Sequence, residues 1–199
     1  MRETAGHNRN ARRTRAAIES AFLALLEQKP IRKLTVQELI DRANICRTTF
    51  YTHYQDVPDL VESVETALLD ELRTALEKLD RTPIRVGEEY PTIRAVVELY
   101  ARRADAFRLL NSENGDPGFD ERFQNTIYEV TRDLRAAKEG AAFDEMRHRL
   151  YSCYVISGGI SVLNRLLSEG LPLDFTQASS ILCAMASAAE RVFLGDAND

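Results

Sequence analysis

The stretch that decides the fold runs from Leu34 to Tyr54, LTVQELIDRANICRTTFYTHY. Thr35 and Glu38 have the spacing of a capping box, in which each side chain bonds the other residue's backbone at the start of a helix. Asn44 marks a turn after that helix, because Asn tolerates the left-handed backbone conformation. A second short helix is expected over about Arg47 to Tyr54. The stretch therefore predicts two helices joined by a tight corner, the form of a helix-turn-helix.

The polar face of the second helix is a candidate nucleic-acid surface, because an α-helix fits the DNA major groove. Arg47 is suited to a bidentate pair with guanine, and Thr methyl groups are suited to contact thymine. The residues expected on the buried side are Val36, Ile45 and Phe50. The candidate DNA-contacting residues are Arg12, Arg13, Thr35, Gln37, Arg47, Thr48, Thr49, Tyr51, Thr52 and His53. A pair of packed helices with no DNA role is the alternative interpretation.

Charge is distributed unevenly along the 199 residues. The net charge of −5 taken alone disfavours binding to nucleic acid. Residues 1–56, however, hold ten Lys and Arg against six Asp and Glu, a net of +4, while residues 57–199 carry −9. A basic head on an acidic body predicts that only the head contacts a polyanion.

Apolar residues recur at helical spacing along nearly the whole chain, and strand patterning is not convincing anywhere. Breaks in this periodicity fall at residues 81–90 and at NGDPG, residues 114–118. Asp56 is expected to cap a long helix, and Gly170 to end another. The fold class is therefore expected to be all-α, with about nine helices.

The head resembles the TetR-like (tetracycline-repressor-like) transcriptional regulators of bacteria. The resemblance covers roughly residues 12–64, and its motifs are Leu34-Thr35-Val36, Leu39-Ile40, Ala43-Asn44-Ile45 and Thr49 to Tyr54. It implies a helix-turn-helix DNA-binding domain over residues 1–56 and a helical effector-binding and dimerisation domain over residues 57–199. It also implies a homodimeric repressor of double-stranded operator DNA that a small-molecule effector releases. Control by a partner protein instead of a small ligand is the alternative.

Four positions depart from the family pattern, one of them conservatively, since Tyr54 replaces a common Phe. Asn44 stands where the family usually has the turn Gly, and Cys46 replaces the usual Ser or Thr cap of the second helix. Val57 stands where many members carry a Lys that contacts phosphate. The missing Lys implies one phosphate contact fewer than the family pattern provides.

The last two expected helices carry a wide apolar surface. The resemblance implies that they form the homodimer interface, and burial inside one subunit is the alternative. The candidate interface residues are Ile156, Ile160, Leu163, Leu167, Ile181, Met185 and Val192.

The middle helices are expected to enclose any effector pocket, with aromatic side chains as its lining. The candidate lining residues are Tyr100, Phe107, Phe119, Phe123, Tyr128, Tyr151 and Tyr154, and core packing is the alternative for each. The segments Phe107 to Leu110, Gly115 to Phe119 and Tyr154 to Gly170 look like a subgroup that includes regulators of dihydroxyacetone kinase operons.

No enzyme, cofactor or metal chemistry is expected. The chain has no nucleophile elbow or phosphate loop, and its three His residues are scattered. Glu145 and His148 have a spacing that metal ligands use, but a second such pair is missing. The three Cys residues show no paired spacing, MRETAGHNRN lacks the apolar core of a secretory signal, and no apolar run approaches the ~20 residues of a membrane span. A cytoplasmic protein without a membrane partner is expected.

Overall fold

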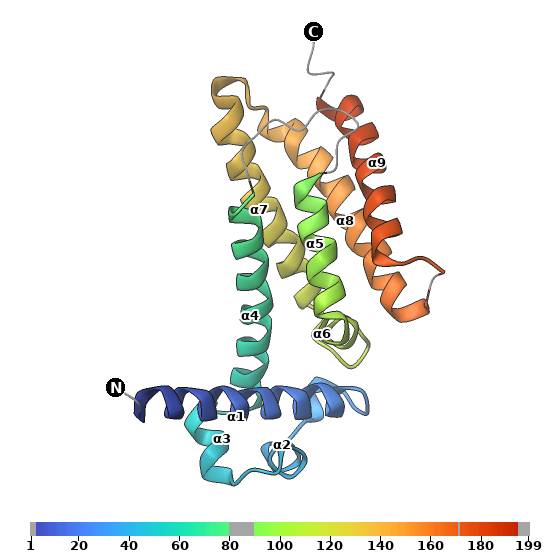
Figure 1. The fold of residues 1–199 in the computed structure, drawn as a ribbon. Coiled ribbons are helices and arrows are strands. Elements are labelled where there is room, and N and C mark those ends of the chain that lie inside the picture. Colours follow the sequence, from blue (N-terminus) through green and yellow to red (C-terminus); the bar gives the residue numbers. More distant parts are fainter. Residues whose placement is uncertain (1–2, 80–89, 171, 195–199) are drawn as a thin grey trace. The chain divides into compact units, whose positions relative to one another are not determined.

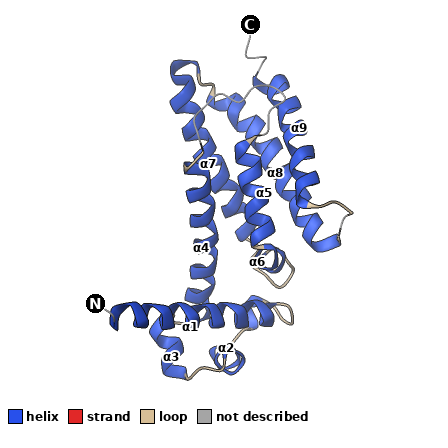
Figure 2. Cartoon of the chain, in the orientation of Figure 1, coloured by secondary structure: helices blue, strands red, loops and turns tan. Residues whose placement is uncertain are grey.

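A computed structural model describes residues 3–79, 90–170 and 172–194 of the chain. These residues form nine α-helices and two short 3-10 turns, without a strand among them, as Figure 2 shows. The elements are α1 (Glu3–Leu26), η1 (Ile31–Lys33), α2 (Val36–Ala43), α3 (Arg47–His53), α4 (Val57–Glu77), α5 (Pro91–Arg102), α6 (Ala104–Leu110), α7 (Phe119–Glu139), η2 (Gly140–Ala142), α8 (Glu145–Glu169) and α9 (Phe175–Leu194). The expected all-α class is confirmed.

The chain divides into two compact units. The first comprises the chain up to Leu68 together with Leu109–Pro117, and the second comprises Leu69–Arg108 with the chain from Gly118 onward. The division after Leu68 falls inside α4, whereas the sequence places the functional boundary at residues 56 and 57. Which residues act as the DNA-binding head stays a prediction.

In the first unit, α2 and α3 lie on the same side of α1, as Figure 1 shows. Ile18, Phe22 and Leu26 repeat every four residues on α1 and are fully buried. Leu39 from α2 and Phe50 from α3 are buried to the same extent. Residues four apart share one face of a helix, so this row forms the apolar seam against which the two short helices pack.

Residues 114–117 of the breaker NGDPG belong to this first unit rather than to a simple linker. The amide of Ile31 donates to the carbonyl of Asn114 at 2.7 Å, and the side-chain amide of Asn114 donates to the carbonyl of Leu26 at 3.1 Å. These bonds satisfy backbone groups beyond the end of α1. A Cβ built on Gly115 would lie 1.9 Å from the carbonyl oxygen of Leu110, so only glycine fits that position.

In the second unit, α8 packs against both α7 and α9, and α5 packs against α9 (Figure 1). The rings of Tyr100 and Phe107 stack with their centres 3.9 Å apart, and Phe123 meets both rings edge to face. Together with Phe119 these side chains form a solid aromatic cluster, buried to at least 99%. The cluster fills the interior where α5, α6 and α7 meet.

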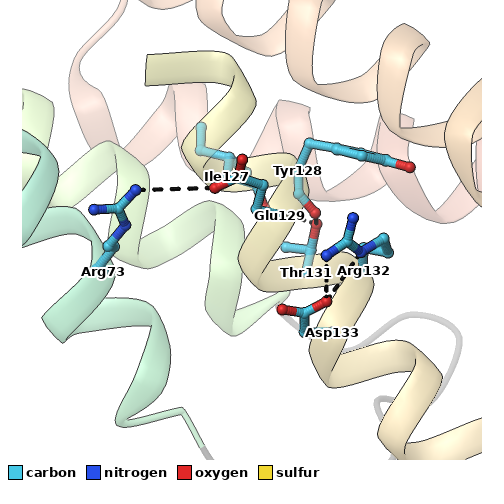
Figure 3. A network of polar contacts seen from close by, with 7 residues as sticks. All are labelled: Arg73, Ile127, Tyr128, Glu129, Thr131, Arg132 and Asp133. Atoms are coloured by element: carbon cyan, nitrogen blue, oxygen red, sulfur yellow. Dashed lines mark hydrogen bonds and ion pairs between the residues drawn. The ribbon is translucent and has the colours of Figure 1, made fainter. Parts of the chain in front are cut away.

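Figure 3 shows the polar contacts along α7. Arg73 of α4 reaches Glu129 at 3.9 Å, and Arg132 pairs with its neighbour Asp133 at 2.7 Å. Exposed ion pairs of this kind add little stability. The hydroxyl of Thr131 donates to the carbonyl of Ile127 at 2.8 Å, so it is already engaged within its own helix.

Most expected helix boundaries agree with the structure. Asp56 accepts from the amide of Asp59 at 2.8 Å and caps α4, and Gly170 ends α8 with a φ of 62°. A break at Arg103 separates α5 from α6. The expected loop at residues 81–90 falls outside the described residues, except for Tyr90, which is buried before α5.

Among the described residues, none of the helices is both long enough and apolar enough to cross a membrane.

Candidate nucleic-acid interface and ligand cavity

The start of α2 is fixed by the predicted capping box. The amide of Glu38 donates to Thr35 Oγ1 at 3.3 Å, and the amide of Thr35 donates to Glu38 Oε2 at 3.1 Å. Lys29 adds an ion pair to the same carboxylate. The bonds from Lys29 and Thr35 lower the pKa of Glu38, because they stabilise its charged form. The segment after α1 is thereby tied to the first turn of α2.

Asn44 makes the corner between the two helices. Its φ of 51° and ψ of 52° lie in the left-handed region, where Asn is among the tolerated residues. The amide of Ile45 then donates to the carbonyl of Ile40 at 3.1 Å, which closes the end of α2. Asn44 therefore makes the turn that the sequence predicts at this position.

Cys46 occupies the cap position of α3, but its side chain makes no capping hydrogen bond to the backbone. Its sulfur instead lies 3.1 Å from Thr48 Oγ1 and 2.9 Å from Thr49 Oγ1. These two hydroxyls stabilise the thiolate and lower the pKa of Cys46 to about 7. The side chain is exposed, so the polar face of α3 begins with a readily ionised thiol.

The exposed face of α3 carries most of the predicted DNA contacts. Arg47, Thr48, Tyr51 and Thr52 are exposed, whereas Thr49 and His53 are partly buried. The hydroxyl of Thr52 donates to the carbonyl of Thr48 at 2.9 Å. Phe50, on the opposite side of the helix, is fully buried. The helix therefore shows a polar outer face and an apolar inner face, as the sequence predicts.

The remaining candidates flank α3. Arg12 and Arg13 are exposed on α1, and Thr35 and Gln37 are exposed at the start of α2. Gln37 donates to Asp41 at 2.9 Å along its own helix. Partial burial, with the charge of Arg15 nearby, lowers the pKa of His53 and favours its neutral form. The first unit thus gathers all ten candidates, and their DNA contacts stay a prediction.

A cavity of about 300 Å³ lies within the second unit. Its walls come from α5, α7, α8 and α9 and are mostly apolar. The apolar lining includes Val96, Val97, Ile127, Ile160, Leu163 and Leu182. This size and lining are typical of small-molecule sites.

Two of the three charged residues in the cavity wall, Arg135 and Glu190, belong to one connected network, and the third, Lys138, is exposed. Arg135 donates to Glu139 at 2.6 Å and to Glu190 at 2.5 Å. The hydroxyl of Tyr90 donates to the other oxygen of Glu190 at 2.5 Å. Burial and the adjacent carboxylate raise the pKa of Tyr90 to about 12, so the phenol keeps its proton.

His148 and Ser152 are buried polar residues of the cavity wall, and His148 has only 2% of its surface exposed. Its Nε2 lies 3.2 Å from the hydroxyl of Ser152, one turn further along α8. Its Nδ1 is buried without a hydrogen-bond partner. Burial lowers the pKa of His148, and the positive charge of Arg135 lowers it further, so the ring is neutral at pH 7.

Two of the seven expected lining residues lie on the cavity wall. Tyr151 and Tyr154 line the cavity, and Tyr128 instead stacks on His148 with the ring centres 5.9 Å apart. The prediction is wrong for four residues, because they form the solid aromatic cluster and leave no space between their rings: Tyr100, Phe107, Phe119 and Phe123.

Sequence reasoning missed Tyr90, Arg135 and Glu190, and it considered His148 only as half of a metal pair with Glu145. Glu145 is exposed while His148 is buried, so the two do not face one site. The 100-residue separation of Tyr90 from Glu190 leaves no local pattern for their pairing.

The residues of the predicted dimer surface differ in exposure. Ile181, Met185 and Val192 are exposed along α9, with Val192 81% exposed, and Ile156 and Leu167 are partly buried. Ile160 and Leu163 are buried inside their own subunit, at 2% and 1% exposure, so the prediction is wrong for them. The structure adds further exposed apolar residues on α8, namely Met146, Leu150 and Tyr154. This apolar face of α8 and α9 is a candidate interface.

Comparisons with known proteins point to one kind of fold. No protein-family model matches the chain. An uncharacterised HTH-type transcriptional regulator of Bacillus subtilis, YxbF, is 27% identical over 89 residues, which are 42% of this chain. The chain spans only 23% of the length of that relative.

The solved structures match over nearly the whole chain. A TetR transcriptional regulator from Streptococcus agalactiae 2603V has a TM-score of 0.61 at 22% identity, over 92% of this chain and 98% of its own. The dihydroxyacetone kinase operon activator DhaS has a TM-score of 0.63 at 14% identity, over 90% and 97%. A putative transcriptional regulator from Pseudomonas aeruginosa PAO1 has a TM-score of 0.57 at 18% identity, over 90% of this chain and 93% of its own. Likenesses at such identities establish a shared fold.

Proposed function

We propose that this chain, which has the fold of the TetR transcriptional regulators, is a homodimeric DNA-binding regulator that represses until a small molecule releases it. The observation that carries the proposal is the exposed polar face of α3 over the buried Phe50. The capping box of Thr35 and the left-handed Asn44 support that placement of α3. A short polar helix presented in this way is the reading element of a helix-turn-helix.

The contacts divide into base reading and phosphate binding. Arg47 is assigned to guanine, and the methyl groups of Thr48 and Thr52 to thymine, since the hydroxyl of Thr52 is bonded to its own helix. Thr35, Tyr51 and His53 are assigned to phosphate oxygens, which fix register without reading sequence. Arg12 and Arg13 add attraction to the DNA backbone that is independent of sequence.

Dimerisation is assigned to the apolar face of α8 and α9. Exposed side chains such as Ile181 and Val192 are costly in water, and a second copy of the same face would cover them. Two-fold symmetry pairs identical patches, so one interface builds a closed dimer. Two heads in such a dimer would read two half-sites about one DNA turn apart, ~34 Å.

Release is assigned to the cavity. The helix α8 contributes both to the cavity wall and to the exposed apolar face, through Tyr151 and Leu150 respectively. A ligand that favours one arrangement of α8 would change the dimer geometry and hence the spacing of the heads. Coupling of this kind requires that the ligand bind the two arrangements with different affinity.

Footprinting on the DNA upstream of the chain's own gene tests the proposal. We expect two protected half-sites with two-fold related sequences, centred about one helical turn apart. The double variant Thr35→Ala with Arg47→Ala is expected to lose DNA binding and serves as the negative control. Sedimentation gives the oligomeric state. Uniform protection or none contradicts the DNA-binding role. A monomer at micromolar concentration contradicts the dimer, and DNA binding that responds only to another protein favours the partner-controlled alternative.

A further inference from the structure

The walls of the cavity restrict its ligand to a largely apolar molecule. Val96 and Val97 from α5, Ile127 from α7 and Leu163 from α8 all face it. The volume of about 300 Å³ holds a small ring system or a short chain. Apolar surface of the ligand would replace water against these side chains, which is favourable.

The two partly buried charged groups in the wall, Arg135 and Glu190, do not call for a charged ligand, and Lys138, the third charged residue of the lining, is exposed to solvent. Arg135 is held between Glu139 and Glu190, so its charge is compensated before any ligand enters. Tyr90 donates to the other oxygen of Glu190, so both oxygens of that carboxylate have a hydrogen-bond partner. A ligand carboxylate would compete with these acids for Arg135 and would lie close to Glu190. An uncharged ligand meets no such repulsion.

His148, a residue of the cavity wall, has a ring nitrogen without a hydrogen-bond partner. Its Nδ1 is buried and unpartnered, although buried nitrogens of this kind are nearly always hydrogen-bonded. If Ser152 donates to Nε2, Nδ1 carries the proton and needs an acceptor; if Nε2 donates to Ser152, Nδ1 needs a donor. A hydroxyl group serves as either, so it satisfies both tautomers.

We propose that the cavity binds an uncharged, largely apolar molecule whose hydroxyl group pairs with Nδ1 of His148. This inference rests on the proposed effector role of the cavity and names the chemistry of that effector. The hydroxyl group gives the unpaired nitrogen a hydrogen-bond partner, and the apolar body of the molecule supplies most of the contact area. A ligand without the hydroxyl leaves Nδ1 unpaired. A ligand that carries a carboxylate would be repelled by the negative charge of Glu190.

Three probes of matched shape test the proposal: naphthalene, 2-naphthol and 2-naphthoate, titrated against the full chain by calorimetry or intrinsic fluorescence. We expect 2-naphthol to bind more tightly than 2-naphthoate. In His148→Leu, the ratio of the 2-naphthol affinity to the naphthalene affinity should fall roughly three- to tenfold, the usual net worth of one hydrogen bond. Thr126→Val is the control, since it removes a buried hydroxyl of α7 that lies outside the cavity wall.

A second measurement needs no substitution at His148 and covers a variant that fails to fold. In the ¹⁵N-histidine-labelled parent, the Nδ1 resonance of His148 should shift on adding 2-naphthol and stay in place on adding naphthalene. An unchanged ratio in His148→Leu, tighter binding of 2-naphthoate, or no binding of any probe overturns the inference.

The regulator function is measured separately, by the binding of upstream DNA. If the probes bind as expected but the chain does not bind DNA, the proposed function is contradicted and the inference about the ligand stands. DNA binding without probe binding contradicts only the ligand chemistry.

Discussion

The guanidinium carbon of Arg47 lies 5.7 Å from the centre of the Tyr51 ring, and Arg47 Nη2 donates to the Tyr51 hydroxyl at 3.4 Å. The two side chains are one turn apart on the exposed face of α3. A cation held beside an aromatic ring loses less freedom when it binds a third group. Tyr51 thus holds Arg47 in a narrow range of positions, which favours the proposed contact with DNA.

Arg47→Ala should therefore weaken operator binding by about 1–3 kcal/mol and relax the preference at one base position. The measurement is fluorescence anisotropy with the operator and its single-base variants. Tyr51→Phe should weaken binding less, and the double variant should show coupling between the two positions. The control Arg165→Ala removes one exposed charge from α8, outside the first unit. Equal losses on every base variant would count against a base contact by Arg47.

Thr35→Ala should destabilise the first unit by about 1 kcal/mol, the usual worth of a helix cap. Urea unfolding followed by circular dichroism measures the change. Glu38→Gln gives the matched test of pH dependence. The pKa of Glu38 is lower in the folded chain, so its contribution is present above the unfolded pKa and is lost as the pH falls through the folded pKa. The difference between parent and Glu38→Gln should accordingly shrink in acid, and a constant difference contradicts the assignment.

Cys46 should react with iodoacetamide with a midpoint near pH 7, because the Thr48 and Thr49 hydroxyls lower its pKa to about 7. Mass spectrometry of the tryptic peptide follows the reaction. Replacing Thr48 and Thr49 with Ala should move the midpoint upward, toward the ordinary thiol value of about 8.5. Bound operator should slow the reaction, since Cys46 lies at the start of α3. Reaction that proceeds equally fast with operator present would place Cys46 away from the DNA.

Gly115→Ala should destabilise the first unit severely, because the new Cβ would overlap the Leu110 carbonyl at 1.9 Å. The matched control is Gly158→Ala in α8, where a Cβ meets nothing within 4 Å. That control should be neutral or gain up to about 1 kcal/mol, the helix preference for Ala over Gly. Thermal unfolding of both variants gives the comparison. Similar melting temperatures would show that residues 109–117 adapt around a side chain.

Ile181→Asp with Val192→Asp should convert the dimer to monomers, because each subunit would then bury two carboxylates in an apolar interface. Analytical ultracentrifugation at micromolar concentration reports the change. Ser180→Asp is the control, since Ser180 is an exposed polar residue of the same helix. A double variant that remains dimeric would locate the interface elsewhere.

Local spacing in the sequence was enough to predict the two short helices of the head and most helix ends. Thr35 and Glu38 lie within a few residues of each other and form the predicted capping-box bonds. Asn44 likewise acts through its own backbone conformation. Such signals need no knowledge of distant contacts.

Which apolar residues of the body, residues 57–199, are buried could not be predicted in the same way. Tyr100 and Tyr151 are both aromatic residues at helical spacing, but one lies in the solid cluster and the other on the cavity wall. Ile160 and Ile181 are equally apolar, yet only Ile181 is exposed. These outcomes depend on which helices meet, and helical periodicity gives a face without naming its neighbour.

The central claim is that the exposed face of α3 reads DNA sequence. Anisotropy titration of the purified chain compares the duplex upstream of its own gene with a shuffled duplex of equal composition, at two salt concentrations. We predict binding to the upstream duplex at least about 10³-fold tighter than to the shuffled one, weaker at higher salt, with the preference lost in Arg47→Ala. Equal affinity for both duplexes, or no binding at low salt, would contradict the claim.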